Sequence, residues 1–175
     1  IGLKGIMSVR DARRAVEVVK YPPLGTRGMG ASALRSATFE MRVPRNEYVD
    51  WVNSETLVCV QIEDTEAVRN LESILKVEEV DVFFVGPTDL SGSLGHLKEP
   101  NHPEVRSTVQ HALSTIMAAG RTAGCVGTPD VMAQYASMGV RYLYTHVPTL
   151  LRGSATDALE KVRKAAEARQ NSTTV

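Results

Sequence analysis

The sequence has no excess of charge of either sign, because 20 lysines and arginines balance 20 aspartates and glutamates. Proteins that bind nucleic acid or anionic membrane surfaces through charge carry a basic excess, so we expect neither partner here. The chain also lacks an apolar run close to the roughly 20 residues that a membrane-spanning helix needs. Its first segment, 1–7, has neither the charged start nor the long apolar stretch of a signal peptide.

Cysteine is scarce as well, with only two in 175 residues. Cys59 and Cys125 both lie inside apolar, strand-like runs, so we expect them to be buried core thiols. A disulfide or a redox pair is the alternative. Reduced, buried thiols favour a cytoplasmic protein. The chain begins with Ile1 rather than methionine, directly in a strand-like segment, and we expect it to be part of a longer protein.

What the sequence does contain is an alternation of strand-like and helix-like segments, with 43 % hydrophobic residues in all. Strands are predicted at about 2–7, 57–63, 80–85, 122–126 and 140–145. Helices are predicted at 8–20, 45–54, 65–76, 104–119, 130–138 and 154–169, and loops at 21–30 and 91–102. This alternation is typical of a parallel α/β fold, either an open doubly wound sheet or part of a barrel. We expect a single domain over 1–175 with a polar tail at 170–175.

Two acids mark the ends of neighbouring predicted strands. Glu63 closes the apolar run that begins at Val58, and Asp89 follows the run 80–85 after a short turn. The carboxyl ends of parallel strands form the chemical face of such folds, and two carboxylates there suit a divalent cation with open positions for substrate. The alternative is that the two acids cap helices or form salt bridges. Asp64 is expected to be the N-cap of the helix that starts at Thr65.

Three motifs in this order resemble the HpcH/HpaI family of class II pyruvate-dependent aldolases. They are YPPLGTRG at 21–28, QIE at 61–63 and FVGPTDLSGSLG at 84–95. The family includes 4-hydroxy-2-oxoheptanedioate and 2-dehydro-3-deoxyglucarate aldolases and folds as a (β/α)8 TIM barrel. The resemblance extends to about Leu151 and implies that this chain holds only the last five βα units of the barrel.

The resemblance also implies roles for individual residues. Glu63 and Asp89 match the carboxylates that hold a divalent metal cation, typically Mg²⁺, Mn²⁺ or Co²⁺. The positions that match the family's pyruvate-binding residues are Gln61, Gly86, Pro87 and Thr88. Gln61 corresponds to a side chain beside bound pyruvate, and the turn at 86–89 to a loop whose backbone N–H groups accept the pyruvate carboxylate.

The catalytic residues stay unknown, because the family's essential Arg and its His–Asp pair are expected upstream of residue 1. Four arginines lack the sequence context to replace that Arg, namely Arg10, Arg13, Arg27 and Arg35. The four histidines fall outside the family's motif for the pair, and they are His96, His102, His111 and His146.

The resemblance implies a metal-dependent aldolase, a carbon–carbon lyase that cleaves 4-hydroxy-2-oxo acids to pyruvate and an aldehyde through a metal-stabilised enolate. Two alternatives remain open: a lyase like citrate lyase β or malyl-CoA lyase, and a catalytically incomplete fragment that only binds metal or assembles. A homo-oligomer is expected, because the family forms oligomers and because a barrel without its first strands would expose two sheet edges.

Overall fold

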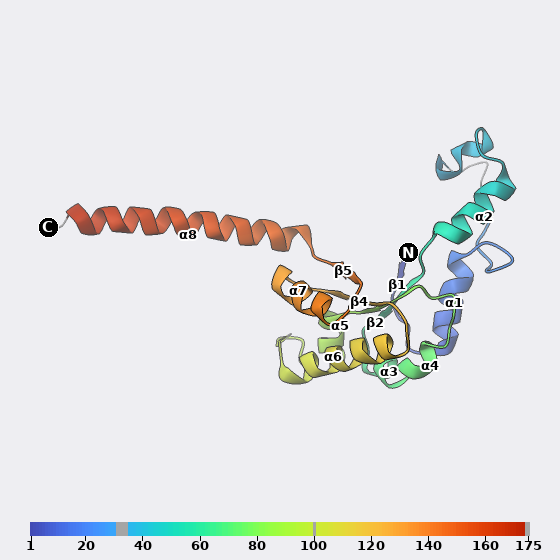
Figure 1. The fold of residues 1–175 in the computed structure, drawn as a ribbon, viewed down its shortest axis with the longest axis horizontal. Helices are drawn as coiled ribbons and strands as arrows, with labels where there is room; N and C mark the ends of the chain where they lie inside the picture. The colour runs from blue at the N-terminus through green and yellow to red at the C-terminus, as the bar shows by residue number, and fades with distance from the viewer. Residues whose placement is uncertain (31–34, 100, 174–175) are drawn as a thin grey trace.

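A computed structural model describes residues 1–30, 35–99 and 101–173 of the chain. Its centre is a five-stranded sheet in the order β1-β2-β3-β4-β5, and each pair of neighbours is parallel (Figure 1). The strands are β1 (Gly2–Leu3), β2 (Cys59–Ile62), β3 (Val82–Val85), β4 (Ala123–Val126) and β5 (Tyr142–Tyr144). Every strand pairs with the next one along the chain, as in a (β/α)8 barrel, whereas a doubly wound sheet reverses its order.

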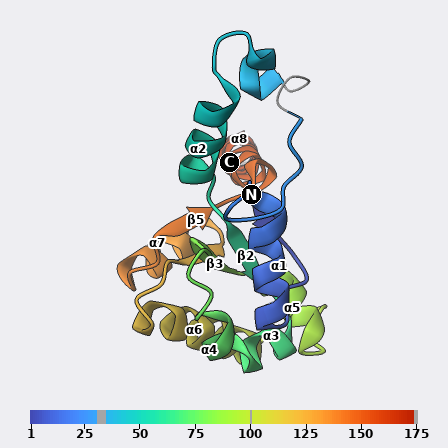
Figure 2. The same cartoon turned by 90° about the vertical axis from the view of Figure 1, so that its right-hand side faces the viewer.

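Helices connect the strands and pack mainly on one face of the sheet (Figure 2). They are α1 (Val9–Val19), η2 (Arg35–Glu40), α2 (Arg45–Glu55), α3 (Thr65–Arg69), α4 (Leu71–Ile74), α5 (Pro87–Ser93), α6 (Pro103–Ala118), α7 (Pro129–Ser137) and α8 (Val147–Thr173). Parallel strands separated by helices confirm the predicted α/β class. Among the described residues, no helix combines the length and apolar character needed to cross a membrane.

The main core lies between the sheet and these helices. Alternate strand residues point into it, including Val60, Ile62 and Phe83, each 0 % exposed. The intervening residues face the other side, where Cys59, Val82 and Phe84 form a smaller cluster. Cys59 and Cys125 are both free and buried, as the sequence predicted.

Local signals placed several helix starts correctly. The Ser8 side chain caps α1 by accepting from the Asp11 N–H at 3.3 Å, and the Asp64 side chain caps α3 by accepting from the Glu66 N–H at 2.7 Å. Pro103 occupies the first turn of α6, where the absence of its N–H costs no hydrogen bond.

Two predicted segments near the start of the sheet were wrong in extent. The first strand ends at Leu3 rather than at residue 7, because Gly5 turns the chain at φ +72° and sends Ile6 into the core. The predicted helix 65–76 is two short helices. Asn70 leaves helical geometry between them, and its side-chain amide donates to the Met7 carbonyl at 2.7 Å.

Two other segments contain more helix than the sequence predicted. The expected loop 91–102 begins inside α5, where Pro87 sets the first turn and the fully buried Leu90 anchors the helix. The last helix begins at Val147 instead of Ser154, and it continues to Thr173 through most of the predicted tail, because neither Pro148 in its first turn nor Gly153 interrupts it.

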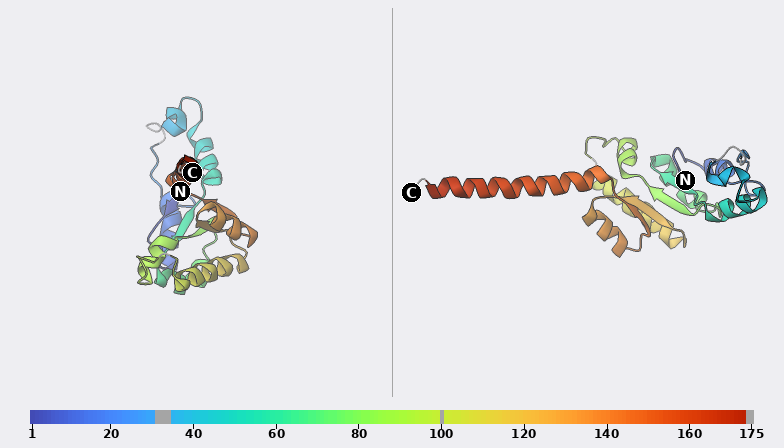
Figure 3. Two further views of the ribbon diagram at one scale, coloured as in Figure 1. Left: turned by 90° about the vertical axis from the view of Figure 1, so that its left-hand side faces the viewer. Right: turned by 90° about the horizontal axis from the view of Figure 1, so that it is seen from above.

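Two elements project from the sheet and its helices. The long helix α8 extends away from the sheet, as Figures 1 and 3 show, and its side chains are exposed throughout residues 151–169. At the other end, α2 and η2 extend outward, and Tyr48 and Val52 of α2 form a small cluster with Tyr21, which follows α1.

Candidate functional site

The two predicted metal ligands lie together at the carboxyl ends of β2 and β3. Glu63 directly follows β2, and Asp89 lies in the first turn of α5, just after β3. The Lys4 ammonium bridges them, with Nζ 2.5 Å from Asp89 Oδ2 and 3.5 Å from Glu63 Oε2. The two carboxylates therefore share the space around one cation, a position that a metal ion could also occupy.

The environment makes the two acids unequal. The Glu63 side chain is only 14 % exposed, and burial raises the pKa of its carboxyl although Lys4 opposes this effect. The Asp89 side chain is 53 % exposed, and the hydrogen bond from Lys4 lowers the pKa of its carboxyl. The contacts with Asp89 and Glu63 raise the pKa of Lys4 in turn. The largely buried Glu63 carboxylate is therefore the less favoured of the two in its charged form, and a bound cation would stabilise that form.

Gly86 makes room for this arrangement. A Cβ atom at position 86 would lie 3.0 Å from Glu63 Cβ and 3.2 Å from Glu63 Oε2. Such contacts are too close for an unshifted side chain, so any larger residue would displace the carboxylate. The glycine in the 84–95 motif thus has a packing role directly behind the acid pair.

A cavity of about 340 Å³ lies beside the acid pair. It is lined by all the residues predicted for metal and substrate: Gln61, Glu63, Gly86, Pro87, Thr88 and Asp89. A second hollow of about 310 Å³ borders the same two acids from the side of Gly5 and Asp64. The structure therefore brings the whole predicted set to one place.

The turn at 86–89 has fewer free backbone donors than its resemblance implied. The Gly86 N–H donates to the Ile62 carbonyl at 3.0 Å, and Pro87 has no N–H. The first N–H groups of a helix have no partner within it, so Thr88 and Asp89 are the positions in this turn that can donate to an anion.

Five residues of the main cavity were not assigned from the sequence: Lys4, Phe84, Val126, Tyr144 and His146. Phe84 stacks on Tyr144 with centroids 5.1 Å apart, and His146 meets the edge of Tyr144 at 5.4 Å. One feature of the sequence could have identified two of these residues. Side chains alternate between the two faces along a strand, which places Phe84 and Tyr144 on the same face of the sheet as Gln61.

Glycine at position 124 makes this aromatic packing possible. A Cβ atom there would lie 3.0 Å from both the Phe84 and the Tyr142 ring.

Among the described residues that line the two hollows, the basic side chains are those of Lys4 and His146, and none is an arginine. Arg27 lies elsewhere, 4.6 Å above the Tyr21 ring.

Comparison with known proteins places these features in a family. Residues 6–139 match the family model described as HpcH/HpaI aldolase/citrate lyase. The chain is 37 % identical over 155 residues to a 4-hydroxy-2-oxo-heptane-1,7-dioate aldolase of Shigella flexneri. This alignment covers 88 % of this chain and 57 % of that protein. It is 34 % identical over 161 residues to a hydroxypyruvate/pyruvate aldolase of Cupriavidus necator, over 89 % of this chain and 59 % of the relative.

Solved structures agree with the sequence relatives. A family protein from Burkholderia cenocepacia J2315 superposes with a TM-score of 0.82 and 32 % identity, over 93 % of this chain and 64 % of that one. An HpcH/HpaI aldolase from Desulfitobacterium hafniense DCB-2 superposes with a TM-score of 0.76 and 29 % sequence identity. This match covers 93 % of this chain and 62 % of that one. The chain spans less than two thirds of the length of each of these proteins. It belongs to the HpcH/HpaI aldolase/citrate lyase family.

Proposed function

We propose that this chain carries the metal- and pyruvate-binding part of a carbon–carbon lyase that cleaves 4-hydroxy-2-oxo acids reversibly to pyruvate and an aldehyde. The observation that carries the proposal is the convergence of Glu63 and Asp89 on one cation, next to Gln61 in the same cavity. The aldolase names of the two relatives support the same reaction class.

The residues present fit a divalent cation. The Lys4 ammonium already occupies the space between the two carboxylates, so a positive charge is accommodated there. An all-oxygen donor set with few protein ligands suits Mg²⁺, Mn²⁺ or Co²⁺ that retains positions for water and substrate. When bound, such an ion would supply Lewis-acid stabilisation of the negative charge that develops on a pyruvate enolate.

The chain's own residues would then bind and orient the 2-oxo acid. The Gln61 amide is half-buried on the cavity wall and can donate to the substrate. The backbone N–H groups of Thr88 and Asp89 can accommodate its carboxylate. Phe84 and Tyr144 give the cavity an aromatic wall.

Calorimetry on the 175-residue protein tests this assignment. Mn²⁺ should bind, and pyruvate or its analogue oxamate should bind only in the presence of Mn²⁺. Unchanged Mn²⁺ affinity in both Glu63→Ala and Asp89→Ala would refute the metal site. Pyruvate release from 4-hydroxy-2-oxo acids, with and without EDTA, measures the activity itself, which we expect to be low because none of the described residues that line the two hollows is an arginine.

Two other outcomes are distinguishable. The family description includes citrate lyase, so metal-dependent cleavage of a carbon–carbon bond in an acyl-CoA substrate, without cleavage of a 2-oxo acid, would identify the lyase alternative. Metal binding without any turnover would identify a catalytically incomplete fragment.

We also propose that the protein is a cytoplasmic homo-oligomer. Helix α8 exposes large apolar side chains, namely Val147, Leu150, Leu151, Leu159 and Val162. Several of these recur at helical spacing, as in a helix that packs on a partner. The two buried, free thiols fit a reducing compartment. Light scattering that reports a stable monomer would contradict the oligomer.

A further inference from the structure

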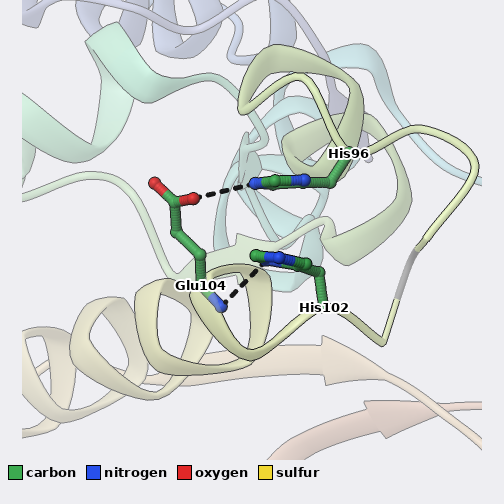
Figure 4. Close-up of side chains that lie close together, drawn as sticks. All are labelled: His96, His102 and Glu104. Atoms are coloured by element: carbon green, nitrogen blue, oxygen red, sulfur yellow. Dashed lines mark hydrogen bonds and ion pairs between the residues drawn. The ribbon is translucent and has the colours of Figure 1, made fainter.

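A second group of metal-ligating side chains lies outside the cavity described above. It consists of His96, in the loop after α5, His102, the N-cap of α6, and Glu104, in the first turn of α6 (Figure 4). One ligand atom from each of the three lies within 4.8 Å of the others. None of the three lines either hollow at the acid pair.

We propose that His96, His102 and Glu104 form a second metal site, selective for Zn²⁺ over Mg²⁺. Two imidazole nitrogens and one carboxylate oxygen match the ligand set of zinc sites with three protein ligands and one open position. Mg²⁺ prefers oxygen ligands, and imidazole suits Zn²⁺ and its transition-metal neighbours. The chain would therefore carry two sites of different chemistry, one with oxygen ligands only and one with nitrogen and oxygen.

The three residues already contact one another in the structure. His96 Nε2 lies 2.8 Å from Glu104 Oε2, and the two atoms share a hydrogen bond. A metal ion bound to both atoms would replace this hydrogen bond. The two imidazole rings stack with centroids 3.7 Å apart and planes 13° from parallel. Parallel rings direct their nitrogen lone pairs side by side, so one ring must tilt about its side-chain bonds to reach a common ion.

The cap of α6 changes when the ion binds. His102 Nδ1 accepts from the Glu104 N–H at 3.3 Å, a long hydrogen bond. A neutral imidazole carries one proton, so coordination through Nε2 places that proton on Nδ1 and ends this bond. Coordination through Nδ1 ends it directly. The metal thus replaces one weak cap, one stacking contact and the His96–Glu104 hydrogen bond with three ligand bonds.

At this position a bound ion would tie two segments of the chain together and still keep one coordination position open. The cluster joins the segment after α5 to the start of α6, and the His96 N–H already donates to the Ser91 carbonyl at 2.7 Å. Helix α5 carries Asp89 at its other end, so a metal at the cluster would hold the helix that presents this acid. The Glu104 side chain is 56 % exposed, which leaves the site open to ions from solution.

Competition between the protein and a chromophoric zinc chelator tests the proposal on the 175-residue chain. The background carries Glu63→Gln and Asp89→Asn, which removes the acid pair as a zinc site. In this background His96→Ala and Glu104→Gln should each weaken Zn²⁺ binding by at least about tenfold, because even outer-shell changes cost this much. The exposed His111 on the same helix provides the control, and His111→Ala should leave Zn²⁺ affinity unchanged.

Two further measurements guard against variants that do not fold. His102→Asn keeps a side chain able to cap α6 but removes the imidazole, so it should lose Zn²⁺ affinity without a large drop in melting temperature. In the wild-type chain with excess Mg²⁺, Co²⁺ should give visible absorption bands that His96→Ala abolishes. Equal Zn²⁺ affinity in His96→Ala and His111→Ala would overturn the proposal, whereas Mn²⁺ binding at the acid pair, measured separately, would be unaffected by that result.

Discussion

The two faces of the sheet share the same five strands but have different surroundings. On the helix-covered face, Val60, Ile62 and Phe83 are each 0 % exposed and contact helices from several parts of the chain. On the other face, Tyr142 and Tyr144 are each 39 % exposed, and Gln61 is half-buried beside the acid pair. The first face provides the stability of the fold, and the second carries the groups that can bind a ligand. Adjacent residues of one strand therefore have opposite roles.

The sharpest test of this difference compares two neighbours in β2. Ile62→Ala removes fully buried methyl groups from the helix-covered face and should lower the free energy of unfolding by about 2–5 kcal/mol. Gln61→Ala should change it by only about 0.5 kcal/mol, since its side chain is half-buried and polar. Urea unfolding followed by circular dichroism measures both.

Oxamate binding should rank the two variants in the opposite order, with the larger loss in Gln61→Ala. With Mn²⁺ present, Gln61→Ala should weaken oxamate binding while leaving Mn²⁺ affinity unchanged, because the proposed partner of Gln61 is the substrate. Equal losses of oxamate and Mn²⁺ affinity in Gln61→Ala would mean that this residue shapes the strand end instead.

The next largest effect concerns the metal. Glu63→Ala and Asp89→Ala should each reduce Mn²⁺ affinity by at least about tenfold to a hundredfold in calorimetry, because each removes one of two protein ligands. Asp64→Asn is the matched control, since Asp64 adjoins Glu63 but caps α3. A similar loss in Asp64→Asn would show that general negative charge, rather than the acid pair, attracts the ion.

Lys4 should have a smaller and opposite effect. Its ammonium competes for the position between the two carboxylates, so Lys4→Met should raise Mn²⁺ affinity several-fold at low salt. We expect the gain in Mn²⁺ affinity to be no more than about fivefold, because ion pairs of exposed side chains are weak in water. The gain should shrink in about 0.5 M salt, and Lys4→Arg should retain the wild-type affinity. Weaker Mn²⁺ binding in Lys4→Met would mean that Lys4 organises the acids instead of competing with the metal.

The smallest effect concerns the thiols, one on each face. Burial raises the pKa of Cys125, on the helix-covered face, to about 11, and raises that of Cys59 on the other face. A thiol-reactive dye at about pH 8 should therefore modify the native protein slowly, Cys59 before Cys125, and the urea-unfolded protein rapidly at both. The raised pKa of Cys125 contributes stability below about pH 9, and this contribution is lost as the pH rises towards about 11. Faster labelling of Cys125 than of Cys59 would contradict the assignment of the open face.

Much of the architecture could be predicted because its signals are local. Each predicted strand overlaps an observed one, and the caps at Ser8 and Asp64 depend on atoms two or three residues away. Glu63 and Asp89 could be paired because parallel strands end at a common edge. The extents of the elements were less predictable. The break at Asn70 depends on a bond to the Met7 carbonyl 63 residues away, and the burial of Leu90 helps to turn an apparent loop into α5.

By itself, the sequence determined the parallel α/β class, the sequential order of helices and strands, and the pair of acids, because periodicity and capping act over a few residues. Only the tertiary structure decided which distant side chains meet. It placed Lys4 against Asp89, 85 residues later, and brought Tyr144 and His146 to the cavity of Gln61. Such contacts follow from strand pairing and from the packing of helices on one face, and no short segment of the chain encodes either.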